Sequence, residues 1–281
     1  MVKTYLPHTW QEALFIRGND DTMLLAGGTD LMVKYHGSPG ITGNFPKPLL
    51  FLNQISSLKT INIEKDSITI GSNVTLNEAA AISALPLILK QAIGEMASPA
   101  IRNAGTLIGN ICNASPAGDT LPPLYVLDAQ LTIESLNGTR QIALADFIQG
   151  PGKIDLKANE IVRCLTIPRQ NNTICFYKKI GMRKAAAISK LSFAAIAQKT
   201  DQKITYIAAA LGAVGPTIIR SQEAENLLTG KTEILTDTWE AMHTIYNSLL
   251  CPIDDKRSSA IYRKTIALNL LTYFYKEYIW Q

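Results

Sequence analysis

Residues 97–119 read ASPAIRNAGTLIGNICNASPAGD, and the rest of the chain is organised around them. They include three Gly, two Pro, three Asn, two Ser and one Thr, and they fit neither a helical nor a strand period. Gly and Asn tolerate positive φ, and successive loop amides can form a nest for an anion. Isolated apolar residues such as Leu107 and Ile111 favour an ordered loop over a disordered one. Composition alone leaves two interpretations open, a phosphate-binding loop and a structural Ω loop.

A second loop of small residues follows an apolar run near the N-terminus. Residues 23–31 read MLLAGGTDL, so that a short buried strand would end at Ala26–Asp30. Backbone N–H groups at such a strand end can hold an anion, although a plain hairpin turn uses the same residues. The spacing matches neither the Rossmann fingerprint nor the P-loop. Two such loops, far apart in sequence, suggest a pyrophosphate held from two sides.

The two loops, AGGTDL and IRNAGTLIGNICNASPAGD, resemble those of the FAD-binding (medium) subunit of the molybdenum hydroxylases, the family of xanthine and carbon monoxide dehydrogenases. Further segments follow in the family's order: Gly150-Pro151-Gly152-Lys153, Lys179 with Arg183, GAVGPTIIR at 212–220 and PIDDKRSSAIYRK at 252–264. The resemblance covers nearly the whole chain. It implies an α+β fold in which a two-lobed PCMH-type FAD-binding domain precedes a smaller α+β C-terminal domain. The expected bounds are 1–170, with lobes at about 1–57 and 58–170, and 171–281.

The resemblance also implies FAD as the cofactor and a set of residues that contact it. These are Ala26, Gly27, Gly28, Thr29, Asp30, Leu31, Thr106, Ile108, Gly109, Asn110, Ser115, Asp119, Leu165 and Lys179. Backbone N–H groups of both loops would hold the pyrophosphate. Asn110, Ser115 and Asp119 would follow the ribityl chain and the ring edge, and Lys179 would lie near the flavin ring.

Each of these assignments has a structural alternative. Asn, Ser and Asp side chains often hydrogen-bond to the backbone of their own loop. Lys179 follows another lysine and could be a solvated surface residue, and Arg183 fits a structural ion pair. No acid–base pair or activated nucleophile stands out in the sequence.

One residue departs from the family pattern. The family has two adjacent glycines where this chain has Ile108-Gly109. If that position requires positive φ, a β-branched residue there costs about 1–2 kcal/mol or more. We would then expect weaker FAD binding or a repositioned loop.

Length and composition exclude several other classes of protein. The 281 residues are 47% apolar, and 27 basic against 23 acidic side chains give a net charge of +4 without a long basic cluster, which argues against nucleic-acid binding. The N-terminus lacks the apolar segment of a secretory signal, and no apolar run has membrane-spanning length, so we expect a cytoplasmic protein. Four separated Cys and three His share no ligand spacing, which argues against a metal site.

Apolar periodicity and capping residues predict the other elements. Thr9 with Glu12 and Thr75 with Glu78 are capping boxes that begin helices. Alternating or short apolar runs predict strands at 23–26, 49–52, 61–63, 68–70, 129–135, 161–167, 191–198 and 204–211, first in a small parallel sheet and then in hairpins. Helical patterns occupy 31–35, 87–96, 238–250 and 258–278, and the last has a core-facing stripe at Leu268, Leu271, Phe274 and Tyr275. The polar residues 170–173 are a plausible domain boundary.

The expected function is that of a relay subunit. Since the chain has no ligand pattern of its own for iron–sulfur or molybdenum centres, the resemblance assigns 2Fe-2S clusters to an iron–sulfur subunit and the molybdenum cofactor to a molybdopterin-binding subunit. Electrons would arrive singly, pass through FAD and leave to NAD⁺ or another acceptor. A purine or related N-heterocycle is the expected substrate of the complex. Two alternatives remain, a flavin-poor assembly or scaffold subunit and a stand-alone FAD oxidoreductase of the same fold.

Overall fold

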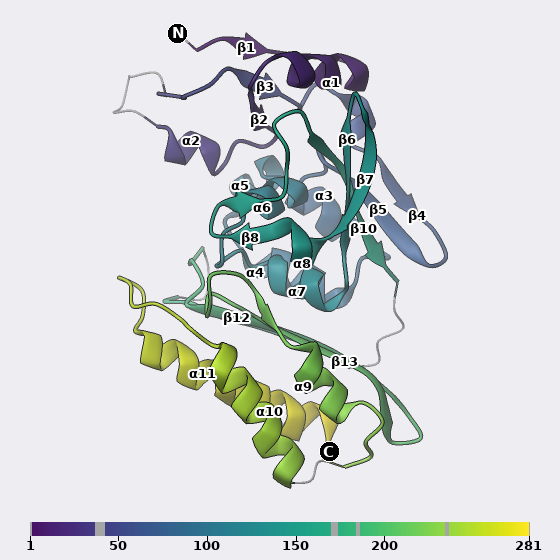
Figure 1. Ribbon diagram of the computed structural model, residues 1–281, viewed down its shortest axis with the longest axis vertical. Helices are drawn as coiled ribbons and strands as arrows, with labels where there is room; N and C mark the ends of the chain where they lie inside the picture. Colours follow the sequence, from purple (N-terminus) through teal and green to yellow (C-terminus); the bar gives the residue numbers. More distant parts are fainter. Residues whose placement is uncertain (1, 37–42, 170–173, 184–185, 234–235, 281) are drawn as a thin grey trace. The chain divides into compact units, whose positions relative to one another are not determined.

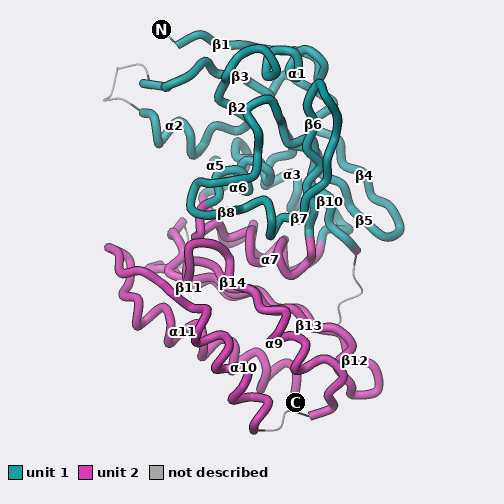
Figure 2. The backbone as a smooth tube through the Cα atoms, in the orientation of Figure 1, with its two compact units in different colours: residues 1–85, 98–114, 129–168 teal, residues 86–97, 115–128, 169–281 magenta. Residues whose placement is uncertain are grey.

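The computed structural model describes residues 2–36, 43–169, 174–183, 186–233 and 236–280. The chain forms two compact units, each drawn from separate parts of the sequence (Figure 2). The first unit comprises Met1–Leu85, Ser98–Ala114 and Ala129–Pro168, and the second comprises Pro86–Ala97, Ser115–Asp128 and Arg169–Gln281. The expected boundary at residues 170–173 lies outside the described residues, so the division at residue 170 stays a prediction.

The first unit contains a three-stranded parallel sheet in the order β1-β3-β2 (Figure 1), which confirms the predicted small parallel sheet. Its strands are β1 (Thr4–Tyr5), β2 (Met23–Leu25) and β3 (Leu49–Phe51). Helix α1 (Trp10–Asn19) connects β1 to β2 and shares an apolar core with this sheet. Thr9 caps the helix as predicted, by accepting a hydrogen bond from the Glu12 N–H. The Glu12 carboxylate, however, accepts from the N–H of His8, so only half of the predicted capping box forms.

The first unit also contains a five-stranded antiparallel sheet in the order β4-β5-β10-β6-β7. Its strands are β4 (Ile61–Ile63), β5 (Ser67–Gly71), β6 (Gln130–Ser135), β7 (Gly138–Ala143) and β10 (Ile161–Pro168). Both predicted hairpins are confirmed, because β4 pairs with β5 and β6 pairs with β7. Alternation along β5 places Ile68 and Ile70 in the core, where both are fully buried.

Short elements complete the first unit. They are α2 (Leu31–Lys34), η1 (Ser56–Leu58), α3 (Leu76–Ala81), α5 (Pro99–Ala104), α6 (Leu107–Asn113), α8 (Leu144–Phe147), β8 (Ile148–Gly150) and β9 (Lys153–Ile154). The capping box before α3 is complete: Thr75 accepts from the Glu78 N–H, and the Glu78 carboxylate accepts from the Thr75 N–H at 2.8 Å.

The expectation of a non-helical loop at residues 97–119 is wrong, because this segment contains α5 and α6. Ser98 caps α5, which has Pro99 in its first turn, and Thr106 caps α6, which ends at the left-handed Ala114. Helices of six and seven residues are too short to show a period in sequence. Their caps were the available signal.

The second unit is built on a four-stranded antiparallel sheet in the order β11-β12-β13-β14. The strands are β11 (Ile174–Ile180), β12 (Leu191–Thr200), β13 (Lys203–Gly212) and β14 (Ile219–Arg220). The predicted hairpin of two apolar runs is confirmed as β12 and β13. Seven consecutive residues of β12, 191–197, are buried, which explains why this strand reads as a continuous apolar run.

Helices cover both faces of this sheet. Helices α4 (Leu87–Glu95) and α7 (Leu121–Val126) contact its strands, while α9 (Gln222–Leu228), α10 (Thr236–Leu249), α11 (Ala260–Phe274) and the π-helical turn η2 (Tyr275–Ile279) share a second apolar core with it. Leu271, Phe274 and Tyr275 are buried in that core and Leu268 packs against it, so the predicted core-facing stripe is confirmed. Within the described ranges, no helix combines the length and apolar character needed to cross a bilayer.

Candidate functional site

The first predicted loop leaves β2 at Leu25 and enters α2 at Leu31. Gly28 has a φ of +71°, a conformation that side chains disfavour. Within the described part of the chain, the backbone N–H groups of Gly27, Gly28, Thr29 and Asp30 donate to no protein acceptor. Four neighbouring donors without protein acceptors suit an anion.

The two predicted loops meet inside the first unit. A Cβ atom added to Gly27 would lie 2.1 Å from the Ala104 carbonyl oxygen and 2.8 Å from the Gly105 Cα. A Cβ added to Gly105 would lie 3.2 Å from Thr29 Oγ1, so the contact is close from both sides. Only glycine permits this approach of two backbones. The joint between α5 and α6 is therefore placed against the Gly-Gly-Thr turn.

The joint itself is held to the start of α3. The Leu76 N–H donates to the Gly105 carbonyl at 2.9 Å, and the Leu107 N–H donates to the Val74 carbonyl at 3.3 Å. Thr75 and Thr106 form an isolated antiparallel bridge. The second loop is thus fixed by backbone pairing to a neighbouring helix cap.

Three amides of the second loop are already used within the protein. The Gly109 N–H donates to the Thr106 hydroxyl at 3.0 Å, and the Asn110 N–H donates to the Thr106 carbonyl at 3.0 Å. The Leu107 N–H has the partner described above. The sequence assigned the pyrophosphate equally to both loops, but the unsatisfied donors lie mainly in the first.

Ile108 does not have the positive φ that would have cost free energy at a β-branched residue. Ile108 lies in the first turn of α6 and is not among the described residues with positive φ, so its backbone is unstrained. Its side chain is buried. The glycine that the turn requires is Gly109, where a Cβ would lie 2.7 Å from the Thr106 hydroxyl oxygen. The condition on which weaker FAD binding was expected, a positive φ at Ile108, is therefore not met.

Asp119 and Lys179 form a buried ion pair in the second unit. Lys179 Nζ lies 2.6 Å from Asp119 Oδ2, and the two side chains are only 6% and 7% exposed. The same ammonium donates to the Glu95 carbonyl at 3.1 Å, and the Ser189 hydroxyl donates to the other Asp119 oxygen. The alternative of a solvated Lys179 is wrong.

Burial raises the pKa of the Asp119 carboxyl above its ordinary value, and the contacts of Lys179 and Ser189 oppose that rise. Tyr177, two residues before Lys179 on β11, has a buried hydroxyl without a partner in the described chain. Burial, with the negative charges of Asp119 and Glu95, raises the pKa of Tyr177 well above its ordinary value. The cluster thus holds one formal positive charge that is neutralised by one carboxylate.

Sequence reasoning missed Ser189, Tyr177 and the Glu95 carbonyl. Tyr177 shares a strand face with Lys179, and this spacing of two was a usable signal. Ser189 and Glu95 reach the cluster only through tertiary folding, and nothing local in the sequence marks them.

Other predicted cofactor residues have contacts or burial that a structural role explains. Ser115 accepts from the Ala117 N–H at 3.3 Å, as the loop-stabilising alternative expects. Leu165 is fully buried in β10, opposite Ile70 and Leu131. Asn110 is half-buried on α6. Their roles toward FAD stay predictions.

Acidic residues cap the N-terminus of the last helix, α11. Asp254 accepts from the Ala260 N–H at 2.6 Å, at the first residue of α11. Asp255 pairs with Arg263 at 2.6 Å. Arg183 donates to the Ala186 carbonyl at 3.0 Å.

Comparison with known proteins identifies the family. The family model described as the FAD binding domain in molybdopterin dehydrogenase matches residues 1–170, and the CO dehydrogenase flavoprotein C-terminal domain matches residues 176–278. The chain belongs to the FAD-binding subunits of the molybdenum hydroxylases. FAD is accordingly the cofactor of this subunit, and the resemblance and fold class expected from sequence are confirmed.

Individual relatives of this FAD-binding subunit support the same family. It is 31% identical to the nicotinate dehydrogenase FAD-subunit of Eubacterium barkeri over 86% of this chain and 82% of that protein. It is 32% identical to a xanthine dehydrogenase FAD-binding subunit of Escherichia coli O157:H7, over 74% and 72% of the two chains. Among solved structures, a carbon monoxide dehydrogenase chain of Hydrogenophaga pseudoflava matches with a TM-score of 0.86 and 25% identity, over 96% of this chain and 94% of that one.

Proposed function

We propose that this FAD-binding subunit carries electrons from an iron–sulfur subunit to NAD⁺ or another acceptor, in a complex that oxidises a purine or related N-heterocycle. Bound FAD would supply the chemistry that the protein lacks, because flavin exchanges electrons singly or in pairs. The observation that supports the proposal is the glycine contact between the two loops, beside four backbone donors without protein partners.

The chain's own residues would bind and orient the cofactor. The N–H groups of Gly27–Asp30 would donate to the pyrophosphate, which explains why no P-loop lysine is needed. Gly27 keeps this turn close to Gly105, and Gly109 completes the cap that shapes the second loop. The residues on either side of the contact therefore fit a phosphate-bearing cofactor.

The proposed substrate class belongs to the complex as a whole. Relatives include subunits named for nicotinate, xanthine and caffeine dehydrogenases, whose named substrates are nitrogen heterocycles, and others named for glyceraldehyde and carbon monoxide dehydrogenases. The heterocycle would bind on the molybdenum-containing partner. We also propose the domain division at residue 170. The match to the FAD binding domain ends at residue 170, and the match to the C-terminal domain begins at residue 176.

Replacing Gly27 tests the glycine contact. We expect Gly27→Ala to weaken FAD binding at least about tenfold, because a methyl group 2.1 Å from the Ala104 oxygen must displace the turn and its donors. FAD fluorescence titration measures the affinity. Gly94→Ala is the matched control, since a Cβ there meets nothing within 4 Å.

Unchanged FAD affinity in Gly27→Ala, or no FAD binding by the natural chain, would contradict the proposed role of the loop contact in FAD binding.

A test of the electron acceptor requires the complete complex. Reduction of NAD⁺ upon addition of xanthine supports NAD⁺ as the acceptor and the proposed substrate class. Reduction of an artificial dye but not of NAD⁺ supports another acceptor, and reduction of neither overturns the proposal for this substrate.

A further inference from the structure

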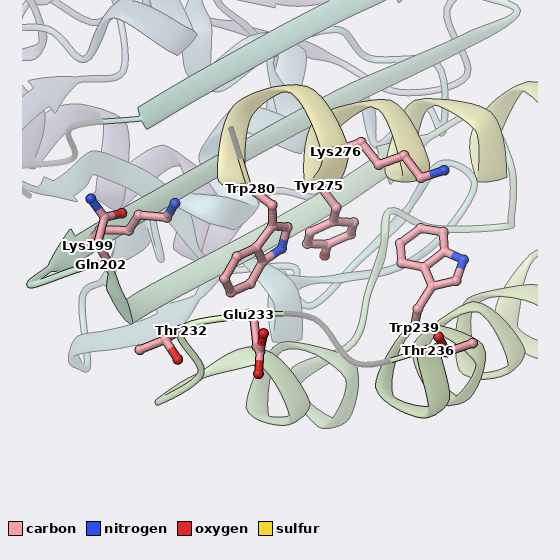
Figure 3. A pocket seen from close by; sticks show the side chains of 9 residues that line it. All are labelled: Lys199, Gln202, Thr232, Glu233, Thr236, Trp239, Tyr275, Lys276 and Trp280. Carbon is pink, nitrogen blue, oxygen red and sulfur yellow. The ribbon is translucent and has the colours of Figure 1, made fainter.

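The second unit contains a cavity of about 530 Å³ that none of the predicted cofactor residues lines. It lies between the β12–β13 end of the sheet, the start of α10 and the C-terminal turn η2 (Figure 3). A volume of this size matches sites for small organic ligands, which are about 300–1,000 Å³. The chemistry of its wall therefore indicates which kind of ligand fits.

Aromatic rings form one side of the cavity. Trp280, Tyr275 and Trp239 follow one another across it (Figure 3). Tyr275 and Trp239 are in edge contact, with centroids 5.8 Å apart and planes at 70°. Two of the chain's three tryptophans thus line one cavity. Flat aromatic walls favour a planar, π-rich ligand.

Two lysines give the cavity a positive edge. Lys199 Nζ lies 5.1 Å from the Trp280 ring centroid and donates to the Ile279 carbonyl, so this cation is held in place. Lys276 is exposed and forms no ion pair with a described carboxylate. Glu233 is the one acidic residue of the lining. Two cations against one carboxylate favour a ligand with a single negative charge.

Two buried donors in the same wall have no partner. The Tyr275 hydroxyl and the Trp280 indole N–H lack a hydrogen-bond acceptor in the described chain. A buried donor without an acceptor costs roughly 1–3 kcal/mol, so such groups usually indicate a water or ligand. Both atoms lie below the surface of the cavity, however, so the assignment of a ligand does not use them.

We propose that this cavity binds a planar aromatic carboxylate. Its ring lies against Trp239 and Trp280, which Tyr275 supports from behind, and its carboxylate faces Lys276. Lys199 donates a hydrogen bond to the Ile279 carbonyl, and its positive charge attracts the ligand carboxylate from a distance. The site belongs to the second unit alone and does not depend on how FAD is bound.

Calorimetric titration of the purified chain with benzoate tests this assignment. We expect saturable binding that quenches tryptophan fluorescence, and affinities at least about tenfold lower for benzamide, which lacks the charge, and for cyclohexanecarboxylate, which lacks the planar ring. Lys276→Met and Trp239→Leu should each weaken benzoate binding by a similar factor. Lys65→Met, at an exposed hairpin lysine far along the sequence, is the matched control and should bind normally.

Any of three results overturns the proposal: no saturable heat with benzoate, equal binding of cyclohexanecarboxylate, or native affinity in Lys276→Met. Because Lys276 is exposed, its variant is expected to fold, and circular dichroism verifies this. The FAD content of the same samples reports the proposed function separately, so failure of one does not imply failure of the other.

Discussion

At the residue scale, Asp119 and Lys179 form an ion pair in the second unit in which both side chains are buried. Neither charge has much access to water, and each depends on the other for compensation. Removing one partner therefore leaves a buried charge, whereas removing both does not. For a structural ion pair, the double variant should therefore lose less stability than the single variant. For two independent side chains, the losses of the single variants should add.

Lys179→Met is expected to destabilise the protein by about 3–5 kcal/mol at neutral pH, because Asp119 loses its counter-ion. Without the lysine, burial raises the pKa of Asp119 further, so the folded state takes up a proton more readily than the unfolded state. The loss should shrink as the pH falls toward the ordinary pKa of aspartate. Urea unfolding at several pH values measures it.

The double variant Asp119→Asn with Lys179→Met should recover part of the lost stability, and Lys178→Met, on the exposed side of the same strand, should change little. A double variant no more stable than Lys179→Met would contradict the charge argument.

At the element scale, Arg140 on β7 forms ion pairs with the segment 155–160, which precedes β10. Its guanidinium lies 2.8 Å from Glu160 and 3.0 Å from Asp155, and the Glu160 side chain is only 8% exposed. The Arg140 hydrogen bond lowers the pKa of Glu160, with help from the Lys157 N–H. A lowered pKa in the folded state means stability that is present above the ordinary pKa of glutamate and lost as the pH falls through the lowered value.

Glu160→Gln should cost roughly 1.5–3 kcal/mol at pH 7, the range for hydrogen bonds to charged groups. Its deficit relative to the natural protein should narrow in acid, where Glu160 is protonated in both states. Chemical denaturation at neutral and acidic pH tests this, with the exposed Glu223→Gln as control. A deficit that is constant with pH would refute the role of the charge.

At the scale of the whole molecule, the chain passes between its two compact units five times, and three of these passages follow left-handed residues. Ala97, Ala114 and Asp128 have φ values of 49°, 47° and 52°, and each is the last residue of its segment. A non-glycine residue in this conformation costs about 1–2 kcal/mol. The direction of the chain at these points is thus maintained against local preference by the packing within each unit.

Ala114→Gly should therefore change the stability by less than about 0.5 kcal/mol, since relief of the strain offsets the added entropy of the unfolded chain and the lost burial of the Ala114 methyl group. Ala241→Gly, at an exposed position inside α10, provides the opposite control and should cost about 1 kcal/mol. Thermal unfolding of both variants measures the difference. Equal destabilisation by both would show that Ala114 is not strained.

The sequence by itself determined the elements whose signals are local. Strands such as β12 and β13 follow from long apolar runs, the α3 cap follows from Thr75 and Glu78, and the glycine loops identified the family. Helices α5 and α6 were missed because six or seven residues show no period, and their caps alone were not enough.

Tertiary structure decided what depends on distant segments. It placed Gly27 against Gly105, used three amides of the second loop internally, and removed the concern about Ile108 by setting it in a helical turn. It also gathered the cluster around Lys179 and the aromatic cavity at the C-terminus from residues far apart in the chain. Local propensity acts over a few neighbouring residues, whereas burial and close backbone contacts arise only when distant segments pack together within a folded unit.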